Sequence, residues 1–195
     1  MLASITPLGE RGRQSRWGLT VVAFALAAAV AGAATGAALG AIGSLALAGA
    51  GVQARLAVFA VAACVALALD GVPGRVPGPR RQVNERWREE YRGWVYGVGY
   101  GAQLGVGLST VVLSAATYLA LFAAVLEASA AGGALIVGLF GLARGLQPLA
   151  TWQIRRPEQL VSFHRWLVRL RGPVRPAGLG VLALLVTLSV VGAMS

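Results

Sequence analysis

Long apolar segments dominate the chain and alternate with short polar stretches. Residues 17–54 hold no ionisable side chain, and residues 93–126 hold no charge. Because a membrane-spanning helix needs about 20 mostly apolar residues, both runs are long enough to cross a bilayer. The pattern predicts an all-α integral membrane protein with apolar segments at about 17–50, 55–70, 93–126, 130–150 and 177–194.

Composition excludes an ordinary soluble domain. The 195 residues are 57% hydrophobic and 12% charged, with a mean hydropathy of +0.71. A soluble domain carries roughly 25% charged residues because its surface faces water. Arginine without lysine, together with abundant alanine and glycine, is typical of a GC-rich bacterial genome, so we expect a bacterial inner-membrane protein.

The basic residues are concentrated in three regions. Fifteen of the 17 arginines lie in residues 1–16, 71–92 and 151–176, and the chain has seven acidic residues. Since arginines flanking membrane spans mark the cytoplasmic side, all three regions are expected there, in contact with anionic lipid headgroups. This distribution favours a lipid partner and argues against nucleic acid.

The charge pattern predicts five spans in a single transmembrane domain, with the N-terminus in the cytoplasm and the C-terminus outside. The apolar run that follows the first arginines is too long for a secretory signal, so we expect an uncleaved first span. A helix over residues 17–50 would be about 50 Å long, against a hydrocarbon core of about 30 Å. The alternative is six helices, with two short spans in that segment.

The two halves of the chain resemble each other weakly. Arg16-Trp17 opens one glycine-rich segment, and Arg92-Gly93-Trp94 opens the other. We therefore expect half-repeats at about 16–90 and 91–171 and a final span at 177–194, although membrane composition alone produces some of this similarity. Internal repeats are common in transporters.

Two of the basic regions also predict amphipathic helices in the membrane interface. Apolar side chains recur at helical spacing in residues 80–94 and, after Pro157, at Leu160, Phe163, Leu167 and Leu170. Aromatic and apolar residues on one face, with arginines on the other, suit the headgroup layer.

Glycines recur every four residues in the two long apolar segments. They are Gly32, Gly36 and Gly40 in the first and Gly93, Gly97, Gly101 and Gly105 in the second. Small residues at this spacing let two membrane helices approach closely, so we expect packing faces. The alternative is a helix that can be interrupted and lines a path.

Arg144 is the main candidate for function, because it lies inside an apolar segment and ionisable residues in membranes are often functional. Alternatively, its long side chain reaches the interface. Asp70 and Glu127 end their segments, either as boundary residues or as partners of Arg144 or of a cation. The other candidates along a substrate path form a polar stripe that could equally bond to neighbouring helices: Gln103, Thr110 and Tyr118.

Catalytic and metal-binding patterns are missing from the sequence. Cys64 is the one cysteine and His164 the one histidine, so an intramolecular disulfide and a histidine metal cluster are excluded. We expect no enzyme, cofactor or metal.

Residues 91–148, from Tyr-Arg-Gly-Trp-Val-Tyr to Ala-Arg-Gly-Leu-Gln-Pro, resemble the second half of bacterial cytochrome-c-biogenesis transmembrane proteins of the DsbD type, which are related to LysE-type exporters. The resemblance implies six helices in two inverted three-helix repeats. That family transfers reducing equivalents through a cysteine pair, but residues 91–148 contain no cysteine. The resemblance thus implies a transporter-like scaffold without the thiol chemistry.

Two hypotheses follow for the function. The first is a transporter or exporter-like protein for a small solute or ion. The alternative is a non-catalytic subunit or assembly factor of a larger membrane complex. A stoichiometric partner in mild detergent would favour the subunit, and a homodimer would favour the transporter.

The topology can be tested in the loop at residues 71–92. Cysteines introduced at Arg75 and Arg88, in a Cys64→Ala background, should resist an impermeant thiol reagent in intact cells and react after lysis. The reason is that six arginines hold this loop in the cytoplasm. Rapid labelling from outside would contradict the topology.

Overall fold

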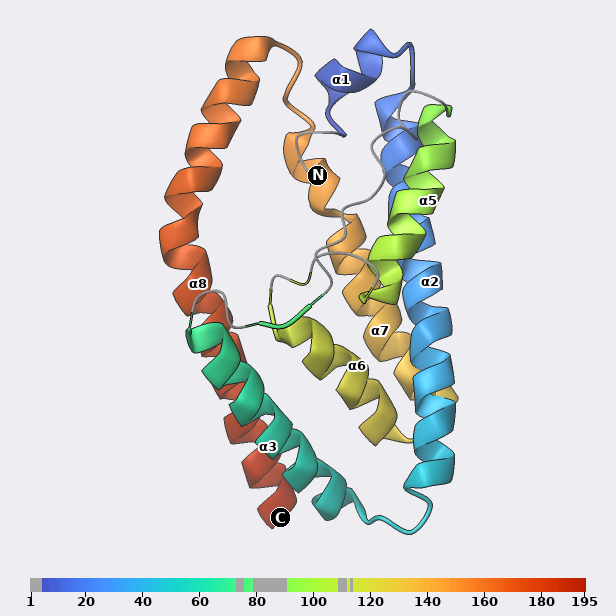
Figure 1. The fold of residues 1–195 in the computed structure, drawn as a ribbon, viewed down its shortest axis with the longest axis vertical. Helices are drawn as coiled ribbons and strands as arrows, with labels where there is room; N and C mark the ends of the chain where they lie inside the picture. Colours follow the sequence, from blue (N-terminus) through green and yellow to red (C-terminus); the bar gives the residue numbers. More distant parts are fainter. Residues whose placement is uncertain (1–4, 73–75, 79–90, 109–111, 113) are drawn as a thin grey trace.

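The computed structural model describes residues 5–72, 76–78, 91–108, 112 and 114–195, and every regular element in them is helical. The elements are α1 (Pro7–Gly12), α2 (Trp17–Ala46), α3 (Val52–Gly71), α5 (Gly93–Val106), α6 (Ala116–Glu127), α7 (Ala130–Gly145), the 3-10 helix η2 (Gln147–Thr151) and α8 (Pro157–Met194). They run mostly along the long axis of the molecule (Figure 1).

The chain is a multi-pass membrane protein. Four described stretches are long and apolar enough to cross a bilayer: Trp17–Ala46, Val52–Gly71, Ala130–Thr151 and Gly172–Met194. The segment at 93–126, expected as one span, is divided into α5 and α6. The first segment, which the six-helix alternative would split, is the single helix α2. Whether α5 and α6 together make a fifth crossing stays a prediction.

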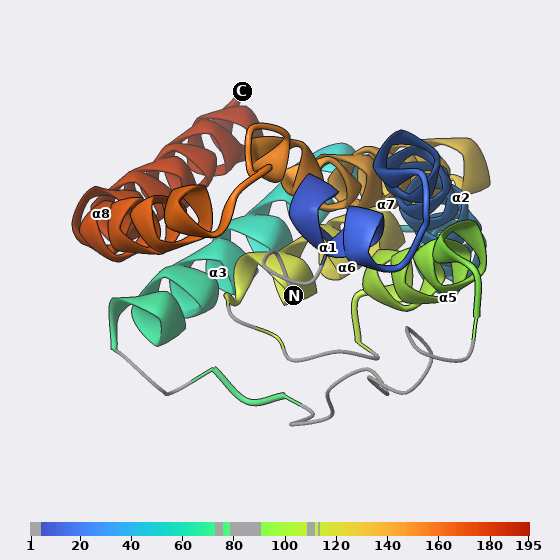
Figure 2. The ribbon, with the colours of Figure 1, turned by 90° about the horizontal axis from the view of Figure 1, so that it is seen from above.

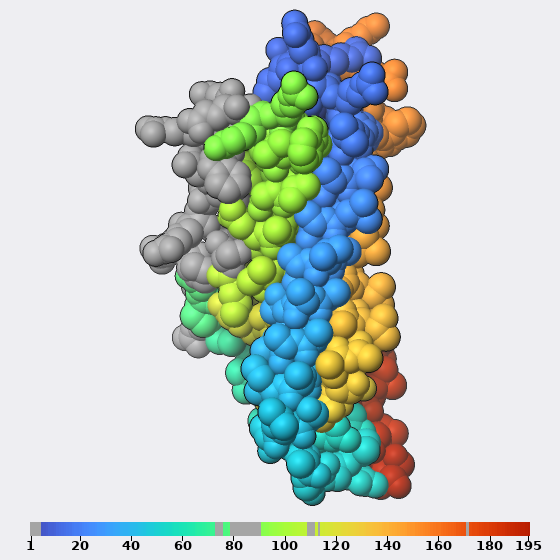
Figure 3. All heavy atoms as spheres, turned by 90° about the vertical axis from the view of Figure 1, so that its right-hand side faces the viewer, coloured from blue at the N-terminus to red at the C-terminus, as the bar shows by residue number. Residues whose placement is uncertain are grey.

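Helix α2 is the centre of the bundle, with α5 against one side and α7 against the other (Figure 3). Glycines lie at both contacts. A Cβ added to Gly32 would lie 2.6 Å from the carbonyl oxygen of Val137 in α7, and one added to Gly105 would overlap the carbonyl oxygen of Ala28 in α2. Real Cβ atoms do not come this close to a carbonyl oxygen, so these glycines let helix backbones touch.

A second layer consists of α3 and α8, seen beside the α2–α5–α7 group in Figure 2. Helix α6 joins the layers. Its Leu119 packs against Ala63 and Ala66 of α3 and Leu182 of α8 in a buried cluster. The small side chains of α3 allow this close approach.

The structure corrects the expected separation between an interfacial helix after Pro157 and the final span. Both belong to α8, one helix of 38 residues with Pro173 and Pro176 in its interior. An interior proline removes a backbone hydrogen bond and bends a helix without necessarily ending it, and α8 curves along its length (Figure 1). The other expected interfacial helix, at 80–94, lies largely outside the described residues.

The basic starts of several elements lie at the same end of the molecule. Helix α1, the start of α5 and the start of α8 are together in Figure 1, whereas the α2–α3 and α6–α7 connections and the C-terminus lie at the opposite end. The N-terminal region and the start of region 151–176 thus share one end, whereas the end of α3, where region 71–92 begins, lies near the middle of the long axis. The assignment of that side to the cytoplasm stays a prediction.

The glycine contacts predict different changes in stability for two glycine-to-alanine variants. Gly105→Ala should destabilise the protein by about 1–3 kcal/mol because a methyl group would overlap the α2 backbone, lowering the melting temperature in detergent. Gly180→Ala adds the same methyl group on α8, where no atom lies within 4 Å. There, replacing a helical glycine should be neutral or stabilise by about 0.5–1 kcal/mol. Equal melting temperatures for the two variants would refute the packing role of Gly105.

Candidate functional site

The candidate site is the break between α5 and α6. Helix α5 ends at Gly107, whose φ of 83° lies in the left-handed region that glycine adopts readily. Helix α6 starts at Ala116 after the N-cap residue Ala115. We call Gly107–Ala115, with the side chains that bind its two ends, the helix break. Residues 109–111 and 113 of it lie outside the described residues.

Arg144 of α7 binds the carboxyl end of α5. Its Nη1 donates to the carbonyl oxygen of Leu104 at 3.3 Å, and the Gly107 N–H donates to the same oxygen at 3.2 Å. The guanidinium carbon lies 5.6 Å from the ring centre of Phe140. Because the carboxyl end of a helix carries partial negative charge, a cation is favourable there.

Asp70, at the end of α3, binds the amino end of α6. Its Oδ1 accepts from the Ala115 N–H at 2.8 Å, and its Oδ2 accepts from the Ser114 hydroxyl at 2.6 Å. The Ser114 hydroxyl oxygen in turn accepts from the Ala116 N–H at 3.1 Å. A carboxylate at a helix N-terminus satisfies free N–H groups and faces the positive end of the helix dipole.

The backbone of Asp70 forms a third link. Arg175 of α8 donates to the carbonyl oxygens of Asp70 and Gly71, at 3.4 and 2.7 Å. Asp70 is therefore the point where α3, α6 and α8 are joined. The Asp70 carboxylate therefore has a structural function at the α6 N-terminus. From the sequence alone, this function could not be distinguished from a position at the membrane boundary.

The alternative in which Arg144 pairs with Asp70 or Glu127 is not seen among the described residues. Arg144 bonds a carbonyl oxygen, and Asp70 bonds α6. The side chain of Glu127 is exposed, at the far end of α6. Arg55 donates to the carbonyl oxygens of Leu126 and Glu127 at 3.2 and 3.1 Å, so a third arginine, after Arg144 and Arg175, binds the carboxyl end of a helix.

The remaining polar candidates lie on both sides of the helix break. Gln103 is half-buried in α5, one residue before the carbonyl group that Arg144 binds. Tyr118 is half-buried in α6, and its hydroxyl donates to the Pro77 carbonyl oxygen. Thr110 lies outside the described residues. The structure thus brings the polar stripe to an interrupted helix.

A buried acidic cluster lies near the N-terminus, and sequence reasoning missed it. The carboxylate of Glu10 in α1 has an exposed fraction of 0%. It accepts hydrogen bonds from Arg13 at 2.5 Å, from the Thr20 hydroxyl at 3.1 Å and from the Tyr96 hydroxyl. The cluster ties α1 to the starts of α2 and α5.

Gly93 makes room for this cluster. A Cβ on Gly93 would overlap the Ser15 hydroxyl and lie 2.5 Å from the Thr20 hydroxyl oxygen and 2.9 Å from Glu10 Oε2. The first glycine of the α5 series thus admits polar side chains, whereas Gly97, Gly101 and Gly105 face the α2 backbone. The sequence signal for the cluster was local only: Thr6 caps α1, with Pro7 at its first turn.

The environment of Glu10 lowers its pKa. Burial alone raises the pKa of this carboxyl group, but hydrogen bonds from Tyr96, Arg13 and Ser15 and the charge of Arg13 outweigh burial. At neutral pH the Glu10 carboxyl group is therefore ionised and forms an ion pair with Arg13. A group whose folded-state pKa is lowered stabilises the fold above its ordinary pKa, and this contribution is lost as the pH falls.

The described part of the chain contains no group of three or more His, Cys, Asp or Glu side chains that could hold a metal ion. Cys64 is a free thiol on the exposed side of α3. The helix break offers hydrogen-bonding groups, helix-end charges, the Arg144 guanidinium and the Asp70 carboxylate.

Comparison with known proteins gives one distant relative. The chain is 34% identical over 133 residues to the methylamine utilization protein MauF of Paracoccus denitrificans, and the match covers 63% of this chain and 47% of MauF. The chain thus spans about half the length of this relative. No family model matches it, and no solved structure matches it. The resemblance of residues 91–148 to the cytochrome-c-biogenesis proteins stays a prediction.

Lowering the pH should remove the stability that the Glu10 cluster contributes. Glu10→Gln should lower the free energy of unfolding at pH 7 by about 1.5–3 kcal/mol, the usual contribution of a hydrogen bond to a charged group. Between pH 6 and pH 3 the wild type should lose melting temperature as Glu10 takes up a proton, and Glu10→Gln should lose less. Glu158→Gln, which removes an exposed carboxylate, should keep the wild-type profile. A parallel fall in wild type and Glu10→Gln would contradict the assignment.

Proposed function

We propose that the protein is a small transporter or exporter-like membrane protein, with the helix break forming part of the path of a small solute or ion. Two half-helices that end inside a bundle support this proposal. Irregular backbone at membrane depth is tolerated where it is buried in protein or lines a cavity. In transporters, substrate sites are commonly built from the ends of such discontinuous helices.

Arg144 is the observation that carries the proposal. It is half-buried in a candidate span, and no carboxylate among the described residues neutralises it. One bond to the Leu104 carbonyl oxygen leaves further N–H groups of the guanidinium for a ligand, because the group has five donors. Arginine suits carboxylate and phosphate groups geometrically, which favours a solute with an anionic group.

The polar side chains around the break fit a role in the path. Gln103 and Tyr118 flank it on α5 and α6, and Thr110 lies within it in the sequence. We propose that they provide hydrogen bonds for the solute, with Asp70 fixing the amino end of α6. Glu127 is proposed as a boundary residue at the far end.

The second candidate function is a non-catalytic subunit or assembly factor. The similarity to a methylamine utilization protein favours this alternative, since the name places that relative in a metabolic system without describing it as a transporter. On this proposal, the chain would stabilise a partner in such a system. Purification in mild detergent distinguishes the two: a stoichiometric partner of different sequence supports the subunit.

Substitution of Arg144 tests the transport proposal. In proteoliposomes on a solid-supported membrane, wild-type protein should give currents with at least one of the sodium salts of chloride, acetate and phosphate. Both Arg144→Gln and Arg144→Lys should reduce them at least tenfold, since lysine cannot reproduce the planar fork of arginine, while membrane insertion stays normal.

Arg55 supplies the matched control, because it also binds the carboxyl end of a helix through carbonyl oxygens. Arg55→Gln should affect stability and leave the current per inserted molecule near the wild-type value. If Arg144→Gln transports as well as wild type, Arg144 is not part of the path. If the two glutamine variants lose stability and activity in parallel, Arg144 is only a helix cap.

A further inference from the structure

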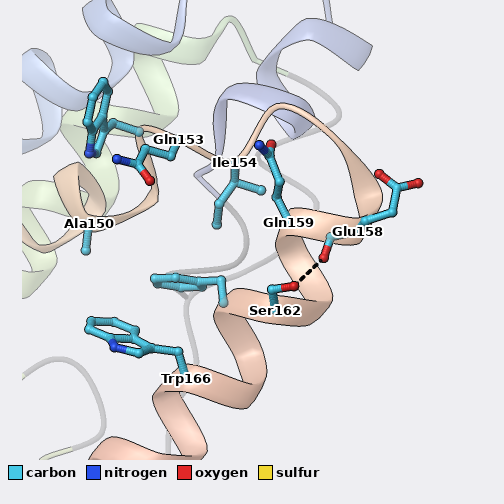
Figure 4. A pocket seen from close by; sticks show the side chains of 9 residues that line it. Ala150, Gln153, Ile154, Glu158, Gln159, Ser162 and Trp166 are labelled. Atoms are coloured by element: carbon cyan, nitrogen blue, oxygen red, sulfur yellow. Dashed lines mark hydrogen bonds between the residues drawn. The ribbon is translucent and has the colours of Figure 1, made fainter.

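A groove of about 480 Å³ lies between η2 with the residues after it and the first half of α8 (Figure 4). Trp152 and Gln153 contribute from one side, and Phe163 and Trp166 from α8. In the close view, Trp166 extends from α8 toward the side on which Ala150 lies. Neither the helix break nor the Glu10 cluster includes these residues.

The walls of the groove are strongly aromatic. The rings of Phe163 and Trp166 are stacked, with centres 5.6 Å apart. Trp152 and Trp166 nevertheless have exposed fractions of 55% and 50%. Two half-exposed indoles that line one groove favour an occupant with an apolar part, because their rings are better covered than left in water.

The free polar groups of the groove are mainly donors. Gln159 already accepts from the N–H groups of Arg155 and Arg156, and the Ser162 hydroxyl donates to the Glu158 carbonyl oxygen. The carboxylate of Glu158 points away from the other lining side chains (Figure 4). The indole N–H groups of Trp152 and Trp166, which can only donate, remain together with the amide of Gln153, which has two donors and one acceptor. Donors thus outnumber acceptors, which favours an occupant with acceptor oxygens.

Charge around the groove is positive. Arg155, Arg156, Arg165 and Arg169 are exposed, and no acidic side chain in the described part of the chain pairs with them. Glu158 is the one acidic residue in the region 151–176. Such a field favours an anionic occupant.

The position of the groove relative to the bilayer identifies the source of that occupant. The candidate span in α8 begins at Gly172, six residues after Trp166, which corresponds to about 9 Å along the helix. The headgroup layer extends about 5–8 Å beyond each side of the hydrocarbon core. Trp166 is therefore near the outer boundary of the headgroup layer, and tryptophan is enriched at this interface in membrane proteins.

We propose that the groove binds one anionic phospholipid. The indole N–H groups of Trp152 and Trp166 donate to ester or phosphate oxygens of the lipid, and the arginines around the groove select negative headgroups. An acyl chain runs along the apolar side of α8, past Phe163 and Leu167, toward the hydrocarbon core.

Lipid titration of the full chain tests this site. Delipidated protein in mild detergent is titrated with dioleoyl phosphatidylglycerol or dioleoyl phosphatidylcholine, and bound lipid is counted by native mass spectrometry. Wild-type protein should bind the anionic lipid at least fivefold more tightly. Trp152→Phe combined with Trp166→Phe keeps aromatic rings and removes both N–H groups, so this variant should lose at least threefold in affinity for phosphatidylglycerol.

Trp94→Phe is the matched control, since Trp94 on α5 is 47% exposed and lies outside the groove. It should bind both lipids as wild type does. Arg155→Gln with Arg156→Gln should reduce the preference for phosphatidylglycerol while leaving the affinity for phosphatidylcholine unchanged.

Three results would overturn the proposal. The first is equal affinity of wild type for the two lipids. The second is unchanged binding by the double tryptophan variant. The third is a wild-type dimer that binds no lipid and dissociates on Trp152→Phe with Trp166→Phe, because the occupant would then be a second copy of the chain.

Discussion

The direct contact between helix backbones on both sides of α2 is the constraint on which the rest of the structure depends. Gly105 of α5 meets the Ala28 carbonyl oxygen, and Gly32 of α2 meets that of Val137 in α7. Lipid tails are as apolar as helix side chains, so the hydrophobic effect gives little drive for helices to associate within a bilayer. Close packing along three backbones replaces it, and it fixes α5 and α7 relative to each other.

This rigid centre explains how α5 can end inside the molecule. Where a helix stops, its last carbonyl groups lose their partners, and in lipid an unsatisfied backbone group costs several kcal/mol. Arg144 extends from α7 to the end of α5 because both helices are held against α2. On the other side of the break, Asp70 of α3 accepts a hydrogen bond from the Ala115 N–H at the amino end of α6. The ends of the interrupted helix are thus bound by side chains from two different neighbours.

The sequence predicted the features that repeat along the chain. The length of the apolar segments predicted a helical membrane protein, and the spacing of the glycines predicted the faces on which helices approach closely. An interruptible helix was the alternative for the glycine-rich segment, but the position of the division within residues 93–126 was not predictable, because this segment has no proline and no charge. The Glu10 cluster was also missed, since Glu10 and Tyr96 are 86 positions apart and nothing local to either residue reports the contact.

The arginines differ in function although they share one chemistry. The arginines of the basic regions whose side chains the structure describes are mostly exposed, as contact with water or lipid headgroups requires. Arg55, Arg144 and Arg175 each bind the carboxyl end of a helix, whose partial charge of about −0.5 offsets only part of a full positive charge. Arg55 lies at the end of the candidate span Val52–Gly71, close to water, which offsets the remainder. Arg144 is half-buried within a candidate span and has no carboxylate partner among the described residues, so its positive charge supports the proposal that an anionic group enters the helix break.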